Sequence, residues 1–115
     1  MHDMVLQSAG VGAIVVALIH GWLGETSIAR ASIEPARLRT LIRLVWQAST
    51  VAWIGGGVLL IAAPWMASAT ARHWIVVTMA LVFAFGAFGN ALASRGRHYG
   101  WLAMSAVVVL AVAGY

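Results

Sequence analysis

The sequence of 115 residues contains no cysteine and no lysine, and its only acidic residues are Asp3, Glu25 and Glu34. Without cysteine the chain forms no disulfide, holds no metal through thiolates and carries out no thiol redox chemistry. Charged residues make up 9% of the chain and hydrophobic residues 63%, whereas a soluble domain has about 25% charged residues. A fold of this size cannot hide so much apolar surface from water, and a disordered chain would be far more polar. The composition therefore excludes a soluble globular domain and a disordered protein.

The sequence contains long apolar stretches instead. Four windows without Asp, Glu, Lys or Arg are residues 4–24, 44–71, 73–94 and 98–115. About 20 helical residues cross the hydrocarbon layer of a bilayer, where backbone polar groups must bond to each other in helices or closed barrels. Because the windows do not alternate in polarity as barrel strands do, they favour helices. The sequence therefore predicts an all-α membrane protein, a bundle of four transmembrane helices in one domain. The predicted spans are residues 4–23, 41–63, 73–94 and 98–115, within a single domain of residues 1–115.

Turn residues indicate where these helices begin and end. Gly24 is expected to end the first helix, because glycine readily adopts the left-handed conformation of a helix C-terminus. Pro35 suits a first helical turn, so the second helix is expected to begin near Ala36 and to run into the membrane as far as Pro64. The residues before the first span contain no Lys or Arg, which is atypical of a cleavable signal peptide. We therefore expect the first span to be retained.

The seven basic residues are all arginine, and their distribution indicates an orientation. One of them, Arg72, lies in the second connection. The others flank the first and third connections and are Arg30, Arg37, Arg39, Arg43, Arg95 and Arg97. By the positive-inside rule, the first and third connections face the cytoplasm and both termini face the outer, periplasmic side. We expect a multi-pass protein of the bacterial inner (cytoplasmic) membrane, and we interpret the net charge of +4 as a topology signal, with no nucleic-acid partner.

Small residues recur every four positions on the predicted spans, a spacing that lets membrane helices approach closely. On the second span, Ala48 and Ala52 lead into the run Gly55–Gly57. This run favours close helix packing, and a bend is the alternative, because three consecutive glycines weaken a helix. The residues predicted to make close helix contacts are Ala13, Ala17, Gly21, Ala52, Gly56 and Gly86.

Polar side chains are costly inside lipid, so each one near a span is a candidate for function. With the orientation above, a cluster of them shares the cytoplasmic half of the bundle. This predicted polar cluster consists of His20, Glu25, Arg43, Gln47, Thr50, Asn90 and His98. Isolated charges are unfavourable there, so we expect Glu25 to pair with Arg43 or another arginine of the first connection, with His20 close enough to hydrogen-bond. The alternative is a structural role, with interhelical hydrogen bonds for the amides and histidines and headgroup contacts for Arg43.

No catalytic residue is predicted, because the sequence contains no phosphate-binding loop, nucleotide fingerprint, catalytic triad or metalloprotease motif. Zinc requires three or four ligands, and the sequence does not supply them in one pattern, so no metal site is predicted. A b-type haem held by His20 and His98 is the one cofactor that the histidines allow, although bis-histidine ligation needs both rings to point inward from facing helices. We therefore expect no enzyme activity and, apart from such a haem, no cofactor.

Two segments resemble a known group of proteins. The segment His20-Gly-Trp-Leu-Gly-Glu25 follows the first span, and Arg39-x-x-x-Arg43-Leu-Val-Trp46-Gln47 leads into the second. They resemble small, uncharacterised four-helix bacterial inner-membrane proteins with H-x-x-L-G-E after the first span and R-L-x-W entering the second. The resemblance covers the first half of the chain and implies a four-helix fold without an assigned activity. In that pattern histidine often follows the tryptophan, where this chain has Gln47, and this difference argues against a metal or haem role.

Three functions are compatible with these features. We expect first a non-enzymatic subunit or accessory/assembly factor of a membrane complex, which packs as a homo-oligomer or against a larger partner through its small-residue faces. The alternative is a small oligomeric transporter or channel that uses the polar cluster. The third is a haem- or quinone-binding membrane subunit. Co-purification with a partner, transport after reconstitution alone, and a visible chromophore distinguish the three.

Overall fold

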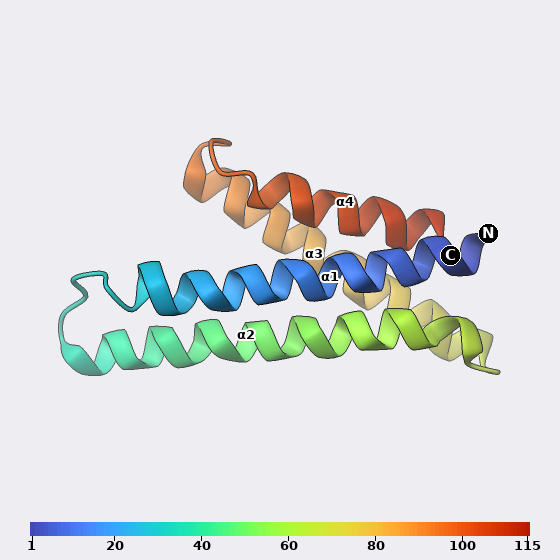
Figure 1. Ribbon diagram of the computed structural model, residues 1–115, viewed down its shortest axis with the longest axis horizontal. Helices are drawn as coiled ribbons and strands as arrows, with labels where there is room; N and C mark the ends of the chain where they lie inside the picture. Colours follow the sequence, from blue (N-terminus) through green and yellow to red (C-terminus); the bar gives the residue numbers. More distant parts are fainter.

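The computed structural model describes residues 1–115 and contains four helices and no strand (Figure 1). The helices are α1 (His2–Leu23), α2 (Ala36–Ala62), α3 (Ala69–Ser94) and α4 (Gly100–Ala113). A π-helical segment, η1, extends α1 over Gly24–Ile28, and a 3-10 helical segment, η2, extends α2 over Ala63–Trp65. The prediction of an all-α fold is confirmed.

Three helices are long and apolar enough to cross a membrane, namely α1 with η1, α2 with η2, and α3. The fourth helix, α4, is apolar but shorter. Its 14 residues rise about 21 Å, against the roughly 30 Å of the hydrocarbon layer. The predicted fourth span, residues 98–115, therefore overestimates this helix. The turn between α3 and α4 takes up the first of those residues, and it begins at Arg95 and Gly96, whose φ angles are positive (51° and 73°).

Successive helices run in opposite directions, which gives the bundle two distinct ends (Figure 1). The connections 29–35 and 95–99 lie at one end, at the left of Figure 1, which we call the loop end. Both termini and the connection 66–68 lie at the other end, the terminal end. There, Arg72 Nη2 donates a hydrogen bond to Asp3 Oδ1 (3.1 Å), which ties the start of α3 to the start of α1.

The α1 and α2 helices lie side by side along their length, and glycine allows their backbones to meet (Figure 1). A Cβ added at Gly10 would lie 2.5 Å from the carbonyl oxygen of Gly57, and one added at Gly57 would lie 2.7 Å from that of Gly10. Both distances are shorter than real Cβ contacts, so only glycine fits this crossing. Ala13 and Ala17 lie fully buried on the same face of α1, in agreement with the predicted small-residue interface.

The glycine run of α2 meets two different neighbours. The helix continues through Gly55–Gly57 without interruption, and Gly56 faces the Met79 side chain of α3 and not another backbone. Ala52 is exposed, because 3.6 residues per turn rotate it away from the stripe of Thr50 and Gly57 that faces α1. The predicted close contact at Ala52 is therefore corrected, because this residue is exposed within the chain.

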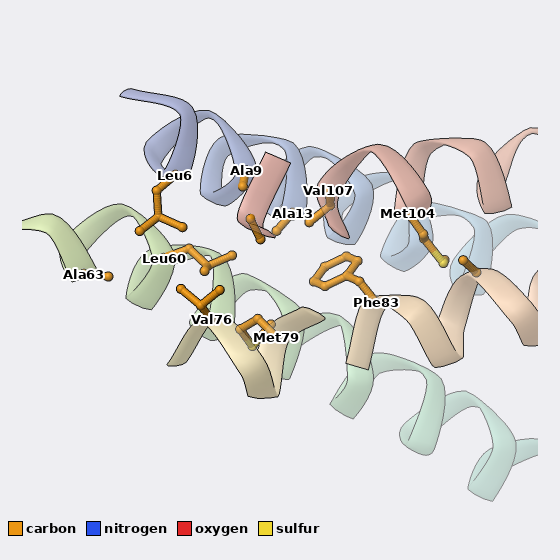
Figure 2. Close-up of a cluster of buried hydrophobic side chains, with 12 residues drawn as sticks. Leu6, Ala9, Ala13, Leu60, Ala63, Val76, Met79, Phe83, Met104 and Val107 are labelled. Carbon is orange, nitrogen blue, oxygen red and sulfur yellow. The ribbon is translucent and has the colours of Figure 1, made fainter. Parts of the chain in front are cut away.

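The hydrophobic core fills the terminal half of the bundle and extends past its middle to Ala87 of α3 and Met104 of α4 (Figure 2). Leu6 of α1, Leu60 of α2 and Phe83 of α3 are fully buried there, and Val107 of α4 packs in the same cluster. No residue between 14 and 59 belongs to this cluster, so the loop half of α1 and α2 is held together by other contacts. The apolar core thus closes the terminal half of the bundle and reaches the loop half only between α3 and α4.

The α3–α4 hairpin leans away from the α1–α2 pair toward the loop end (Figure 1). The α1 helix contacts both α2 and α4, whereas α2 and α3 touch at few points. One such point is Gly86, where an added Cβ would lie 3.0 Å from Met104 Sδ of α4 and 3.6 Å from the Trp53 ring of α2. Because α2 and α3 do not pack together beyond this point, the bundle is open between them at the loop end.

Candidate functional site

The opening between the two helix pairs is a cavity of about 700 Å³. Residues from all four helices and from η1 line it, and most of them are hydrophobic. Its polar lining residues are His20, Ser27, Asn90, Ser94, His98 and Tyr99. None of the lining residues is Asp, Glu, Lys or Arg. The cavity thus combines apolar walls with a small set of neutral polar groups.

His20 points from α1 toward α2 and is half-buried. Its ring stacks on the Trp46 ring, with centroids 4.1 Å apart and an angle of 6° between the planes, and lies 4.6 Å from the Trp53 ring. Its Nε2 lies 3.0 Å from Ser49 Oγ. The sequence predicts that His20 lies near Glu25, and this prediction is wrong. The His20 ring turns inward between two tryptophans, so its hydrogen-bond partner is Ser49.

The end of α1 changes from α- to π-helix where two side chains of α2 bind its backbone. Trp46 Nε1 donates a hydrogen bond to the carbonyl oxygen of His20 (2.7 Å), and Gln47 Nε2 donates one to that of Gly21 (3.0 Å). The π-helical segment begins at the next residues, from Gly24 onward. Side chains that bond into a helix ladder are a known cause of such local changes, and π-helical turns occur often at functional sites.

Gly24 does not end the helix, as the sequence predicted. Its backbone is right-handed (φ −58°, ψ −41°) and the chain continues as η1. The position needs glycine for space, because an added Cβ would lie 2.6 Å from Trp46 Nε1 and 3.1 Å from Gln47 Nε2. Gly24 therefore allows α2 to approach η1 closely.

Glu25 and Arg43 form the ion pair that the sequence predicts. Arg43 Nε donates to Glu25 Oε1 (3.1 Å), and Arg43 Nη2 donates to Glu25 Oε2. Gln47 Nε2 also donates to Glu25 Oε1 (2.7 Å). The side chains of Arg43 and Glu25 are 54% and 43% exposed, so solvent or headgroups reach the pair. These three residues join η1 to α2 and do not line the cavity.

The predicted polar cluster therefore divides into two groups. His20, Asn90 and His98 line the cavity together. The other four lie between α1–η1 and α2 and are Glu25, Arg43, Gln47 and Thr50. Thr50 is buried and donates a hydrogen bond to the carbonyl oxygen of Trp46 (3.2 Å). Its hydroxyl group is therefore paired within α2.

Asn90 and His98 lie on the α3–α4 side of the cavity. Asn90 Oδ1 is buried and has no hydrogen-bond partner. Ser94 Oγ donates to the backbone oxygen of Asn90 (2.7 Å), and His98 Nδ1 accepts from the Gly100 N–H (3.1 Å). The side-chain amide of Asn90 is thus a polar group of the cavity wall with an unmet hydrogen bond.

Sequence reasoning missed several residues of this site. Ser49, the partner of His20, was not singled out, nor were the lining residues Ser27, Ser94 and Tyr99. Ser49 lies between Trp46 and Trp53 at helical spacing, three and four residues from them. That spacing would have placed Ser49 on the face of α2 that carries the two tryptophans.

A haem held by His20 and His98 does not fit this arrangement. His20 Nε2 already bonds to Ser49 Oγ, and its ring is held against two tryptophans. Iron ligation through Nε2 would have to break the first contact. The cavity is better suited to a molecule that contacts its walls without coordination to His20.

No family model matches this chain, and no curated protein or solved structure is significantly similar to it. The likeness of the segment from His20 to Gln47 to small bacterial membrane proteins therefore rests on those residues alone. Inference about function depends on the cavity and its surroundings.

Proposed function

We propose that this chain is a multi-pass protein of a bacterial inner membrane, with all four helices in the bilayer. The loop end, which carries six of the seven arginines, then faces the cytoplasm, and both termini face the periplasm. The common location of the connections 29–35 and 95–99 at one end of the bundle supports this orientation. The short α4 helix is accommodated by local thinning of the bilayer or by polar residues at its ends.

We propose further that the protein acts without catalysis, as a ligand-binding subunit or accessory factor of a membrane complex, and that its cavity holds an amphipathic small molecule. The cavity itself carries this proposal. Small-molecule sites have volumes of roughly 300–1,000 Å³, mostly apolar walls and a few polar groups that orient the ligand. The volume of about 700 Å³ and the lining of this cavity agree with that description.

The size of the cavity favours a small molecule over a helix of a partner. Ten residues of a helix, about 10 Å wide and about 15 Å long, would occupy about 1,000 Å³ or more. The sparse contact between α2 and α3 supports a ligand route from the lipid, because it leaves the cavity open sideways. Partners such as a second copy or a larger complex then bind the outer helix faces.

Binding of an environment-sensitive apolar dye, N-phenylnaphthylamine, to the purified protein in nanodiscs tests the proposal. We expect Ala103→Phe, which adds a ring to the cavity wall, to weaken dye binding about tenfold or more. The matched control is Ala106→Phe, one turn along α4 and outside the cavity, which should bind the dye as the wild type does. Equal binding by the wild type and Ala103→Phe would refute the cavity as the binding site.

A transporter is the second candidate, and one observation favours it. The cavity lies in the loop half of the bundle, while fully buried Leu6 and Leu60 help to close the opposite half. Alternating access requires a site that is closed toward one side of the membrane, and the closed terminal half meets that condition. Reconstitution of the chain alone distinguishes the two candidates, because a transporter moves the bound molecule across the bilayer and a binding subunit does not.

A further inference from the structure

Asn90 lines the cavity and carries a buried side-chain oxygen, Oδ1, with an unmet hydrogen bond. The start of α4 packs closely against it, since a Cβ added at Gly100 would lie 3.1 Å from Asn90 Nδ2. A buried carbonyl oxygen without a donor is unfavourable, and native proteins rarely leave one unpaired unless a water or ligand supplies the donor.

Three of the polar lining residues already make hydrogen bonds. Ser94 Oγ donates to the Asn90 backbone oxygen, and His98 Nδ1 accepts from Gly100 N–H. His20 Nε2 bonds to Ser49 Oγ on the α1–α2 side. Among the lining residues, Asn90 alone has a buried side-chain oxygen that lacks a hydrogen-bond donor.

The charge of the lining restricts the ligand further. No Asp, Glu, Lys or Arg lines the cavity, and the Glu25–Arg43 pair lies outside it. A charged group placed inside would lose its hydration without gaining an opposite charge, which is strongly unfavourable. The cavity consequently favours a molecule whose polar end is neutral.

We infer that the ligand is a neutral amphipathic molecule with a hydroxyl group, of the phenol or quinol type, and that this hydroxyl donates a hydrogen bond to Asn90 Oδ1. The inference rests on the proposed function of the cavity and names the ligand class of the same site. Asn90 is then the residue that selects a hydroxyl over an ether. The apolar wall holds the rest of the molecule.

Displacement of bound N-phenylnaphthylamine by matched probes tests this assignment. The probes are 4-nonylphenol, its methyl ether, which keeps the oxygen acceptor but has no donor, and 4-nonylbenzoate, which is charged at neutral pH. We expect the phenol to displace the dye from the wild type at about tenfold lower concentration than the ether, the effect of one buried hydrogen bond. The benzoate should be weaker than the phenol.

Asn90→Leu, which keeps a side chain of similar size, should bind the phenol and the ether equally. The matched control is Thr78→Val, a polar-to-apolar change on an exposed position of α3 outside the cavity, which should keep the preference for phenol. If Asn90→Leu does not fold, the comparison of phenol and ether on the wild type still decides whether a hydroxyl is recognised.

The outcomes separate the two proposals. Equal displacement by phenol and ether in the wild type, or tighter binding of the benzoate, overturns the ligand class but leaves the cavity as a binding site. A preference for phenol that persists in Asn90→Leu overturns the role of Asn90. Absence of dye binding to the wild type overturns the proposed function itself.

Discussion

Trp46 connects several parts of the loop end. Its Nε1 donates to the carbonyl oxygen of His20, its ring stacks on the His20 ring, and it fills the space that Gly24 leaves free. The same side chain lines the cavity. A single indole group thus joins α1 to α2 and forms part of the cavity wall.

Trp46→Phe is expected to lower the free energy of unfolding by about 1 kcal/mol, because it removes the N–H donor to His20 and keeps an aromatic ring. Trp22→Phe is the matched control, since Trp22 is 65% exposed on the same end of the bundle. Thermal unfolding in one detergent, followed by circular dichroism, measures both. Equal midpoints for the two variants would mean that the hydrogen bond contributes nothing.

Helix α2 shows how one element meets different surroundings at successive residues. A Cβ added at Gly55 would have no neighbour within 4 Å, one at Gly56 would meet the flexible Met79 side chain, and one at Gly57 would meet the backbone of Gly10. Flexible side chains can move aside, whereas a helix backbone cannot without separation of the two helices. The tolerance to substitution therefore changes sharply within the glycine run.

Gly57→Ala is expected to destabilise the protein by roughly 1–3 kcal/mol, since the added methyl group forces α1 and α2 apart. Gly55→Ala is the control within the same run and should be neutral or stabilising by up to about 1 kcal/mol, because alanine favours helix over glycine. Unfolding in a detergent series measures both changes. Two variants of equal stability would contradict the close backbone crossing.

The whole molecule has two unlike halves. Its terminal half is closed by the hydrophobic core and by the contact of Arg72 with Asp3, whereas its loop half holds the cavity and the Glu25–Arg43 pair. The arginines are concentrated at the loop end, with Arg72 alone at the other. The cavity and most of the arginines thus lie in the same half of the molecule.

The proposed orientation predicts opposite accessibility of two single cysteines, Ser32→Cys at the loop end and Ala67→Cys at the terminal end. The chain contains no native cysteine, so each variant offers one site for labelling. A membrane-impermeant maleimide added to intact cells should label Ala67→Cys and should reach Ser32→Cys only after the membrane is opened. The reverse labelling pattern would contradict the proposed orientation and place the loop end outside the cell.

Much of the fold can be predicted from the sequence, because membrane helix formation depends on the local cost of charged and polar groups in lipid. The apolar windows therefore predict four helices, and Pro35 predicts the start of α2 at Ala36. The pairing of Glu25 with Arg43 can also be predicted from the sequence, since both charges lie near the same end of neighbouring helices. The helices and this ion pair depend on the composition of each segment and on the position of its charged residues along the helix.

The partners of individual side chains depend instead on how each helix is rotated and shifted against the next. That rotation exposes Ala52, pairs Gly57 with Gly10, and gives His20 the partner Ser49. The cavity likewise follows from the divergence of α3 and α4 from α1 and α2, which no single segment encodes. Such contacts join residues far apart in the chain and result from the packing of all four helices at once, so only the tertiary structure reveals them.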